Sequence, residues 1–153
     1  MLLTDLLTPE RIRVPLRARS KDDVLRELVL VVSDSDRPDA GAEVLRAVRE
    51  REAVLSTGIG NGVAVPHGKS AAVPDLRIAA GRAEQPIDFD ALDGQPVSLF
   101  FLLVGPEAAA GPHIKALSRI SRLVRKDSVR QQLLAAGTPD EFYAAMKAAE
   151  AAG

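Results

Sequence analysis

The chain has 153 residues, of which 46% are hydrophobic and 27% charged, and its formal net charge is −1. We expect a chain of this length to form one folded domain that buries about two thirds of its unfolded surface. The near-zero charge excludes a global electrostatic attraction to nucleic acid or anionic membranes. The lack of cysteine excludes disulfides, thiol nucleophiles and cysteine zinc sites.

We see no targeting or membrane-spanning segment in the sequence. The N-terminal sequence MLLTDLLTPE lacks the basic region of a signal peptide and reaches acid and proline early. The longest apolar run, VSLFFLLV, is too short to span a bilayer. We therefore expect a cytoplasmic protein that neither inserts into membranes nor binds nucleic acid.

The first part of the chain predicts a strand followed by two helices. Ser20 is placed to cap the first helix, with Asp23 three residues later in the manner of a capping box. A turn around Asp36, Arg37 and Pro38 separates the two helices. The predicted elements are a strand at 12–18, a helix at 21–34 and a helix at 40–55.

The remaining elements are strands and then helices. The continuous hydrophobicity of 96–104 predicts a strand buried on both faces, and Asp93-Gly94 predicts a turn before it. The last helix starts with Thr138 at the N-cap, Pro139 at the first helical position and Glu141 two positions later. Together these elements predict a layered α/β or α+β domain, with strands at 62–67, 76–83 and 96–104 and helices at 113–126 and 139–152.

The stretch STGIGNGVAVPHGKS combines three glycines with a strand and a histidine. GIGNG precedes a strand, whereas a dinucleotide-binding motif follows one, and HGKS lacks the upstream glycine of a P-loop. One interpretation is a tight turn in which Gly58, Gly60 and Gly62 adopt conformations that other residues resist. The alternative is that small residues here let the backbone of another molecule approach closely.

His67 and His113 are the two histidines of the chain. His67 follows Pro66 at the expected end of a strand, on the same side as Val63 and Val65. It is either structural or a nucleophile, because a neutral imidazole can carry a covalent group near neutral pH. His113 falls in the first turn of a helix that starts at Pro112, where it could donate to a phosphate or pack over Leu117 (on one face with Ile120 and Val124).

Arg51 and a group of basic residues on a later helix each have two open interpretations. Arg51 shares a helical stripe with Val44, Val48 and Leu55, so it either extends along the edge of the apolar face or turns toward a phosphate site. A second set forms a basic face roughly opposite that of His113. It is either simply solvated or a docking surface for an acidic partner, and it consists of Lys115, Arg119, Arg122 and Lys126.

Three segments resemble the fructose/mannitol-type enzyme IIA domains of the bacterial phosphotransferase system, and most of all the stand-alone nitrogen-regulatory IIA proteins. They are REAVLSTGIGNGVAVPHGKS, PIDFDALDGQPVSLFFLLVGP and GPHIKALSRISRLV. The most specific block runs from Thr57 through Gly62 to Pro66 and His67, and the likeness extends over nearly the whole chain. Gly111 and Pro112 depart from the family pattern, which usually has polar residues and no proline before the second histidine.

The resemblance implies a layered α/β fold, with a mixed central sheet flanked by helices on both sides and residues 1–153 forming one enzyme IIA-like domain. It implies that His67 accepts a phosphoryl group from the phosphocarrier HPr or its nitrogen-branch counterpart. His113 matches the second active-site histidine, and Arg51 matches the arginine before the glycine loop. The loop that would support the site comprises Thr57, Gly58, Gly60, Asn61 and Gly62.

Three functions follow from this resemblance. The first is a phosphohistidine carrier that signals the state of the phosphotransferase system to cytoplasmic regulatory targets. The second is a sugar-transport component that passes phosphate to a IIB domain, and the third is a binding module with a vestigial phosphosite. Phosphoryl transfer needs no cofactor or metal here; a two-histidine zinc site is the alternative, although no supporting carboxylate stands at ligand spacing.

Overall fold

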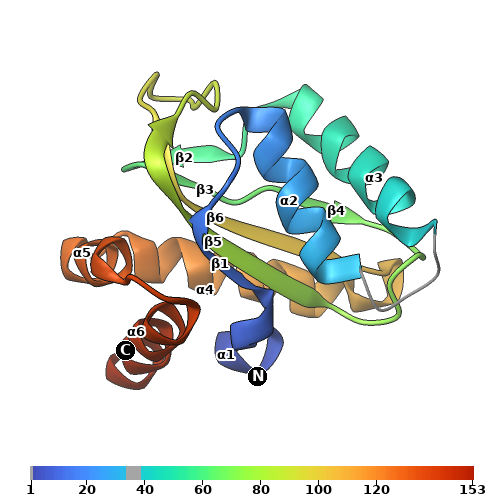
Figure 1. The fold of residues 1–153 in the computed structure, drawn as a ribbon. Coiled ribbons are helices and arrows are strands. Elements are labelled where there is room, and N and C mark those ends of the chain that lie inside the picture. The colour runs from blue at the N-terminus through green and yellow to red at the C-terminus, as the bar shows by residue number, and fades with distance from the viewer. Residues whose placement is uncertain (1, 34–38) are drawn as a thin grey trace.

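The computed structural model describes residues 2–33 and 39–153 and consists of a mixed six-stranded sheet between two layers of helices (Figure 1). The strand order is β1-β5-β6-β3-β2, with β4 also beside β6. β5 and β6 are antiparallel, as are β2 and β3, while β1 is parallel to β5, and β3 and β4 are parallel to β6. The strands are β1 (Ile12–Leu16), β2 (Gly58–Gly60), β3 (Val63–Ala64), β4 (His67–Lys69), β5 (Arg77–Ile87) and β6 (Val97–Gly105).

Helices cover both faces of this sheet, which confirms the expected α/β fold (Figure 1). One layer contains α2 (Lys21–Ser33) and α3 (Ala40–Val54). The other contains α1 (Leu3–Leu6), α4 (Ala110–Val124), α5 (Asp127–Ala135) and α6 (Pro139–Ala152). Short 3₁₀ turns, η1 (Pro9–Arg11) and η2 (Glu107–Ala109), precede β1 and α4. In residues 2–33 and 39–153, no helix has the length and apolar character needed to cross a membrane.

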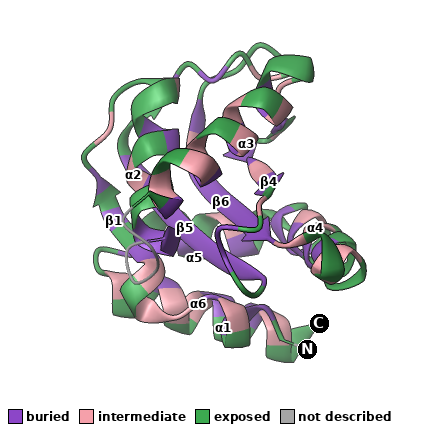
Figure 2. Ribbon diagram, turned by 90° about the vertical axis from the view of Figure 1, so that its right-hand side faces the viewer, coloured by how far each residue is buried: buried purple, intermediate pink, exposed green. Residues whose placement is uncertain are grey.

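The core lies on both faces of the sheet, and β6 contributes to each half. Leu99, Phe101 and Leu103 pack toward α4, α5 and α6, and the alternating Phe100 and Leu102 pack toward α2 and α3. Side chains alternate across a strand, so a strand covered on both faces has to be apolar throughout. Figure 2 shows β5 and β6 as buried between the helices, which confirms the prediction for 96–104.

The predicted helix starts are largely confirmed. The backbone N–H of Asp23 donates to Ser20 Oγ at 3.3 Å, and the N–H of Glu141 donates to Thr138 Oγ1 at 3.1 Å. Pro139 is the first residue of α6, as expected from its fixed φ and missing donor. The prediction for α4 was wrong by two residues: the helix begins at Ala110, continuing directly from η2, so Pro112 is its third residue.

Other predicted boundaries also need correction. The strand predicted at 62–67 is divided into β3 and β4, because Pro66 has no N–H to continue the ladder. Residues 58–60 form the separate strand β2, and residues 127–135 form α5; neither was predicted. β5 continues to Ile87, beyond its predicted end. The turn expected around residues 36–38 lies outside the described residues.

Candidate functional site

His67 is the first residue of β4 and is half-buried beside β6. Its Nδ1 lies 2.9 Å from the carbonyl oxygen of Val65. Because a carbonyl oxygen only accepts hydrogen bonds, this contact assigns the ring proton to Nδ1. The lone pair of the neutral ring is therefore on Nε2.

His113 lies on α4, and its ring is next to that of His67. The two ring centroids are 5.6 Å apart and the ring planes are inclined at 70°. His113 is only 3% exposed, and neither of its ring nitrogens has a hydrogen-bond partner. It occupies the first turn of α4, as predicted, although the helix starts before Pro112. Two histidines that are far apart in the sequence thus meet at one point.

The surroundings of both histidines lower their pKa values and so favour the neutral rings. Burial lowers the pKa of His67, and the charges of Arg51 and Lys69 act in the same direction, against the Val65 carbonyl and Glu52. Burial, followed by the effects of His67 and Lys69, lowers the pKa of His113 from 6.5 to about 4. Desolvation disfavours the charged form of a base, so the pair offers neutral rings in a positively charged setting.

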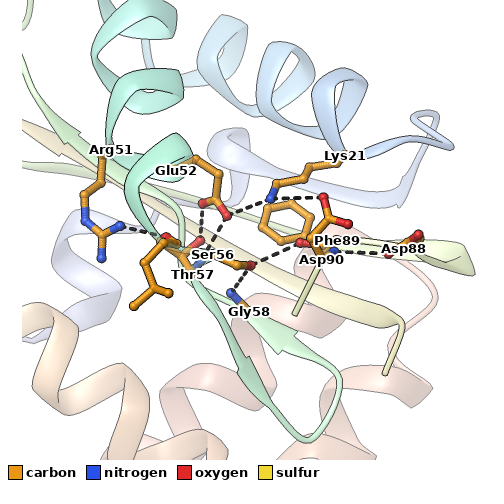
Figure 3. Close-up of polar contacts among 10 residues, drawn as sticks. Lys21, Arg51, Glu52, Ser56, Thr57, Gly58, Asp88, Phe89 and Asp90 are labelled. Atoms are coloured by element: carbon orange, nitrogen blue, oxygen red, sulfur yellow. Dashed lines mark hydrogen bonds and ion pairs between the residues drawn. The ribbon is translucent and has the colours of Figure 1, made fainter. Parts of the chain in front are cut away.

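Arg51 lies in the last turn of α3, where its Nη1 donates to the carbonyl oxygen of Leu55 at 2.8 Å (Figure 3). Val44 and Val48 are buried as the stripe predicted, but Leu55 is 54% exposed and lies just beyond the helix. The apolar stripe therefore does not extend to Leu55. The structure brings the charge of Arg51 close enough to His67 to affect the pKa of that histidine.

The glycine-rich segment forms the β2–β3 hairpin. Gly60, Asn61 and Gly62 have φ angles of 97°, 57° and 74°, which confirms a tight turn built on left-handed conformations. Gly58 serves a different purpose: a Cβ there would lie 2.7 Å from the Cβ of Ala91. The close approach at Gly58 is thus made by the chain itself rather than by another molecule.

Glu52 is a buried residue of this region that the sequence interpretation missed. Only 7% exposed, it accepts from the backbone N–H of Thr57 at 2.9 Å and from Thr57 Oγ1 at 2.5 Å (Figure 3). Lys21 Nζ lies 3.0 Å from Oε2 of Glu52, the oxygen that accepts from the N–H of Thr57, and 4.7 Å from the ring centre of Phe89. A signal was present, because the buried positions Val44 and Val48 continue at i+4 spacing onto Glu52.

Lys115, Arg119 and Arg122 are exposed on α4, whereas His113 is buried, so the predicted opposition of the two faces is confirmed for these three residues. The prediction was wrong for Lys126, which lies beyond the end of α4 at Val124 and is the N-cap of α5. Lys69 is the last residue of β4, and its Nζ lies 3.7 Å from Oε2 of Glu107. The sequence interpretation missed this basic residue, whose charge contributes to lowering the pKa of both histidines. Across the part of the chain that the structure describes, no group of three or more metal-ligating side chains is placed to hold a metal ion.

The sequence profile of one protein family matches residues 5–149. Its description is "Phosphoenolpyruvate-dependent sugar phosphotransferase system, EIIA 2". The chain belongs to this family. The resemblance on which the sequence interpretation depended is therefore confirmed.

Members of this enzyme IIA family carry both regulatory and transport names. The chain is 38% identical to the "Nitrogen regulatory protein" of Bradyrhizobium diazoefficiens, covering 95% of each chain. It is also 38% identical to the "PTS system fructose-specific EIIABC component" of Bacillus subtilis; this match covers 92% of the chain but only 22% of that relative's length.

A solved member of the family has the same fold. The crystal structure of nitrogen regulatory protein IIA-Ntr from Neisseria meningitidis superposes with a TM-score of 0.87 at 33% identity. The superposition covers 94% of this chain and 98% of that one. The mixed sheet and its two helical layers are therefore the architecture of this enzyme IIA family.

Proposed function

We propose that this chain is a phosphohistidine carrier that accepts a phosphoryl group on Nε2 of His67 from an HPr-type phosphocarrier. The observation that carries the proposal is the hydrogen bond from His67 Nδ1 to the Val65 carbonyl, beside the buried ring of His113. This bond leaves the Nε2 lone pair of a neutral imidazole as the nucleophile. Family membership supports a role as a phosphotransferase component.

The proposed transfer exchanges one P–N bond for another and requires no cofactor. As the Nε2–P bond of His67 forms, the P–N bond of the donor phosphohistidine breaks and the donor ring keeps the electron pair. Catalysis then depends on alignment and on stabilising the charge of the phosphoryl oxygens. We assign this stabilisation to an N–H of His113 and to Arg51, whose guanidinium would exchange the Leu55 carbonyl for a phosphoryl oxygen.

The loop Thr57–Gly62 supports the site by presenting a compact surface. Its hairpin turn has small residues at Gly60 and Gly62, and Ile59 is 41% exposed. The turn lies beside the C-terminal part of α4, at Ser121 and Val124, whereas His67 and His113 lie toward the start of that helix. We therefore assign contact with the donor to the surface that runs along α4 from the two histidines to this hairpin.

Phosphorylation of His67 would act as a signal to a cytoplasmic regulatory target. The support is the match to nitrogen regulatory proteins over nearly their full length. A phosphoryl group adds a charge of about −1.5 to −2, which disfavours any partner that buries it. The second candidate is transfer to a IIB domain, supported by the equal identity to a fructose-specific EIIABC component.

The test uses purified protein and a phosphorylated HPr-type donor. The wild-type chain should become phosphorylated, and pull-downs with the unphosphorylated protein, the phosphorylated protein and a His67→Asp variant should capture different sets of proteins. Equal capture by all three, together with rapid transfer to a purified IIB domain, would establish transport instead. A wild-type chain that takes up no phosphate but still binds targets would be a module with a vestigial phosphosite.

A further inference from the structure

Glu52 begins a chain of contacts that ends at His67. Its carboxylate receives both the N–H and the Oγ1–H of Thr57, at the end of α3. The carbonyl oxygen of Thr57 accepts from the N–H of Val65 at 3.0 Å, and the carbonyl oxygen of Val65 accepts from Nδ1 of His67 at 2.9 Å. Each intermediate residue is therefore held on its donor side and holds the next residue through its carbonyl.

These contacts matter because the sheet is interrupted between β3 and β4. Val65 and Pro66 lie in the gap, and Pro66 has no N–H to donate. The N–H of Val65 bonds to the carbonyl of Thr57, one residue pair beyond Gly58 and Ala64 in the antiparallel pairing of β2 and β3. On the other side of the gap, the Pro66 carbonyl accepts from the N–H of Leu103 at 3.1 Å. The position of Thr57 therefore sets one of the two tethers that orient the Val65 carbonyl, and with it the ring of His67.

We propose that Glu52 is a positioning residue for His67, acting through Thr57 and Val65 to hold the imidazole with its proton on Nδ1. The consequence for phosphoryl transfer depends on the proposed function, whereas the effect on the ring does not. A carboxylate suits this role because both of its oxygens accept hydrogen bonds, and Thr57 offers two donors.

The carboxylate of Glu52 has a cationic partner. Lys21 Nζ lies 3.0 Å from Oε2 of Glu52 and 4.7 Å from the ring centre of Phe89 (Figure 3). A buried charge without such partners would be costly. A glutamine at this position could accept from the N–H of Thr57 and donate to its Oγ1, because a hydroxyl also accepts hydrogen bonds. A methionine keeps the length of the side chain but offers no oxygen, so both contacts with Thr57 are lost.

Glu52→Met is the decisive variant, and Glu150→Met is its matched control. Glu150 lies in α6 and holds α1: it accepts from the backbone N–H groups of Leu3 and Thr4 and from the hydroxyl of Thr4. The same chemical change thus removes a similar tether away from His67. Thr57→Val, which loses only the hydroxyl contact, is a milder second variant if Glu52→Met fails to fold.

The first readout is the ¹⁵N NMR spectrum of the His67 ring in the unphosphorylated protein at neutral pH, which reports the tautomer without any donor. We expect a mainly Nδ1–H ring in the wild type and in Glu150→Met, and a mixture of tautomers in Glu52→Met. Thr57→Val should show a smaller shift in the same direction. The second readout is single-turnover phosphorylation, which should slow by about tenfold to 100-fold in Glu52→Met but not in Glu150→Met.

An unchanged tautomer in a folded Glu52→Met protein, or in Thr57→Val if Glu52→Met is unfolded, would overturn the proposal. An equal change in Glu150→Met would also overturn it, because the effect would then be a general loss of stability. If the tautomer responds to Glu52 but the wild-type protein accepts no phosphoryl group, the positioning role stands and the proposed function fails.

Discussion

The buried ring of His113 meets the ring of His67 at an inclination of 70°, with both nitrogens of His113 unsatisfied. A buried polar atom without a partner costs free energy that a hydrogen bond would recover. A phosphoryl oxygen on His67 is an acceptor that would arrive at this point. The unphosphorylated protein thus carries a cost at His113 that phosphorylation of His67 would relieve.

Replacing His113 should separate stability from phosphoryl chemistry. We expect the free energy of unfolding of His113→Leu to lie within about 1 kcal/mol of the wild-type value, or above it, because an apolar side chain removes the unsatisfied atoms. His113→Ala should lose about 2–4 kcal/mol through the cavity it leaves. Both should still be phosphorylated at His67, but more slowly or with a shorter-lived product. Denaturant titration and ³¹P NMR measure these effects; a phosphorylated His113→Leu as long-lived as the wild type would contradict the role of His113.

The free energy of unfolding should depend on pH through His113. Its pKa falls from 6.5 in the unfolded chain to about 4 in the folded one, so between these values the unfolded state binds more protons. This contribution to stability is complete above pH 6.5 and is lost as pH falls toward 4, by up to about 3 kcal/mol. Asp22, with a pKa lowered to about 2 by Arg49 and Arg26, acts only at more acidic pH.

Denaturant titrations of the wild type and His113→Leu between pH 7 and pH 4 isolate this effect. The wild type should lose more stability than the variant over that range, because the variant has no titrating group at this position. Parallel pH profiles would show that His113 does not titrate as its burial requires.

Arg51→Gln should slow phosphoryl transfer while leaving donor binding nearly unchanged. One lost charge-assisted contact in the transition state costs on the order of 10²-fold in rate. The pKa of His67 should rise, because the charge of Arg51 lowers it in the wild type. Single-turnover kinetics and NMR titration measure the two effects.

Arg49→Gln is the control for this change. Arg49 lies on the same helix and pairs with Asp22, so its replacement removes the same charge from an exposed ion pair. Transfer rates that fall equally in both variants would assign the effect to net charge rather than to the guanidinium of Arg51.

Gly58→Ala should destabilise the hairpin, by about 1–3 kcal/mol, because the added methyl would lie 2.7 Å from the Cβ of Ala91. Gly111→Ala is the comparison: nothing lies within 4 Å of the added Cβ, and the position is in α4, where alanine is favoured over glycine by about 1 kcal/mol. Thermal unfolding should move in opposite directions in the two variants. A Gly58→Ala protein as stable as the wild type would show that the contact with Ala91 is not tight.

The sequence predicted what depends on local chemistry. The apolar run of β6 and the caps at Ser20 and Thr138 follow from periodicity and from side-chain donors and acceptors close in the chain. Pro66 predicts the end of a strand and so marks the break between β3 and β4. The three residues of β4 are too few to show the alternation that predicts a strand.

Other parts of the site depend on tertiary contacts. The hydrogen bond between Val65 and Thr57 forms only when β2 and β3 fold back on each other, and the meeting of His67 and His113 requires α4 to pack on β6, with which β4 pairs. Glu52 was accessible in principle through its i+4 spacing from Val48. Charged residues are rarely buried unless they are paired. The sequence alone therefore favours Arg51 rather than Glu52 as the continuation of the apolar stripe of Val44 and Val48.

The most direct test of the account locates the phosphoryl group at atomic resolution. The wild-type protein and His67→Gln are incubated with a phosphorylated HPr-type donor, then analysed by tandem mass spectrometry at neutral pH and by ¹⁵N–³¹P coupling in NMR. If Nε2 of His67 is the acceptor, the wild-type protein carries one phosphoryl group, bonded to that nitrogen, and His67→Gln carries none. Phosphate on His113, on Nδ1 of His67, or retained by the His67→Gln protein would contradict it.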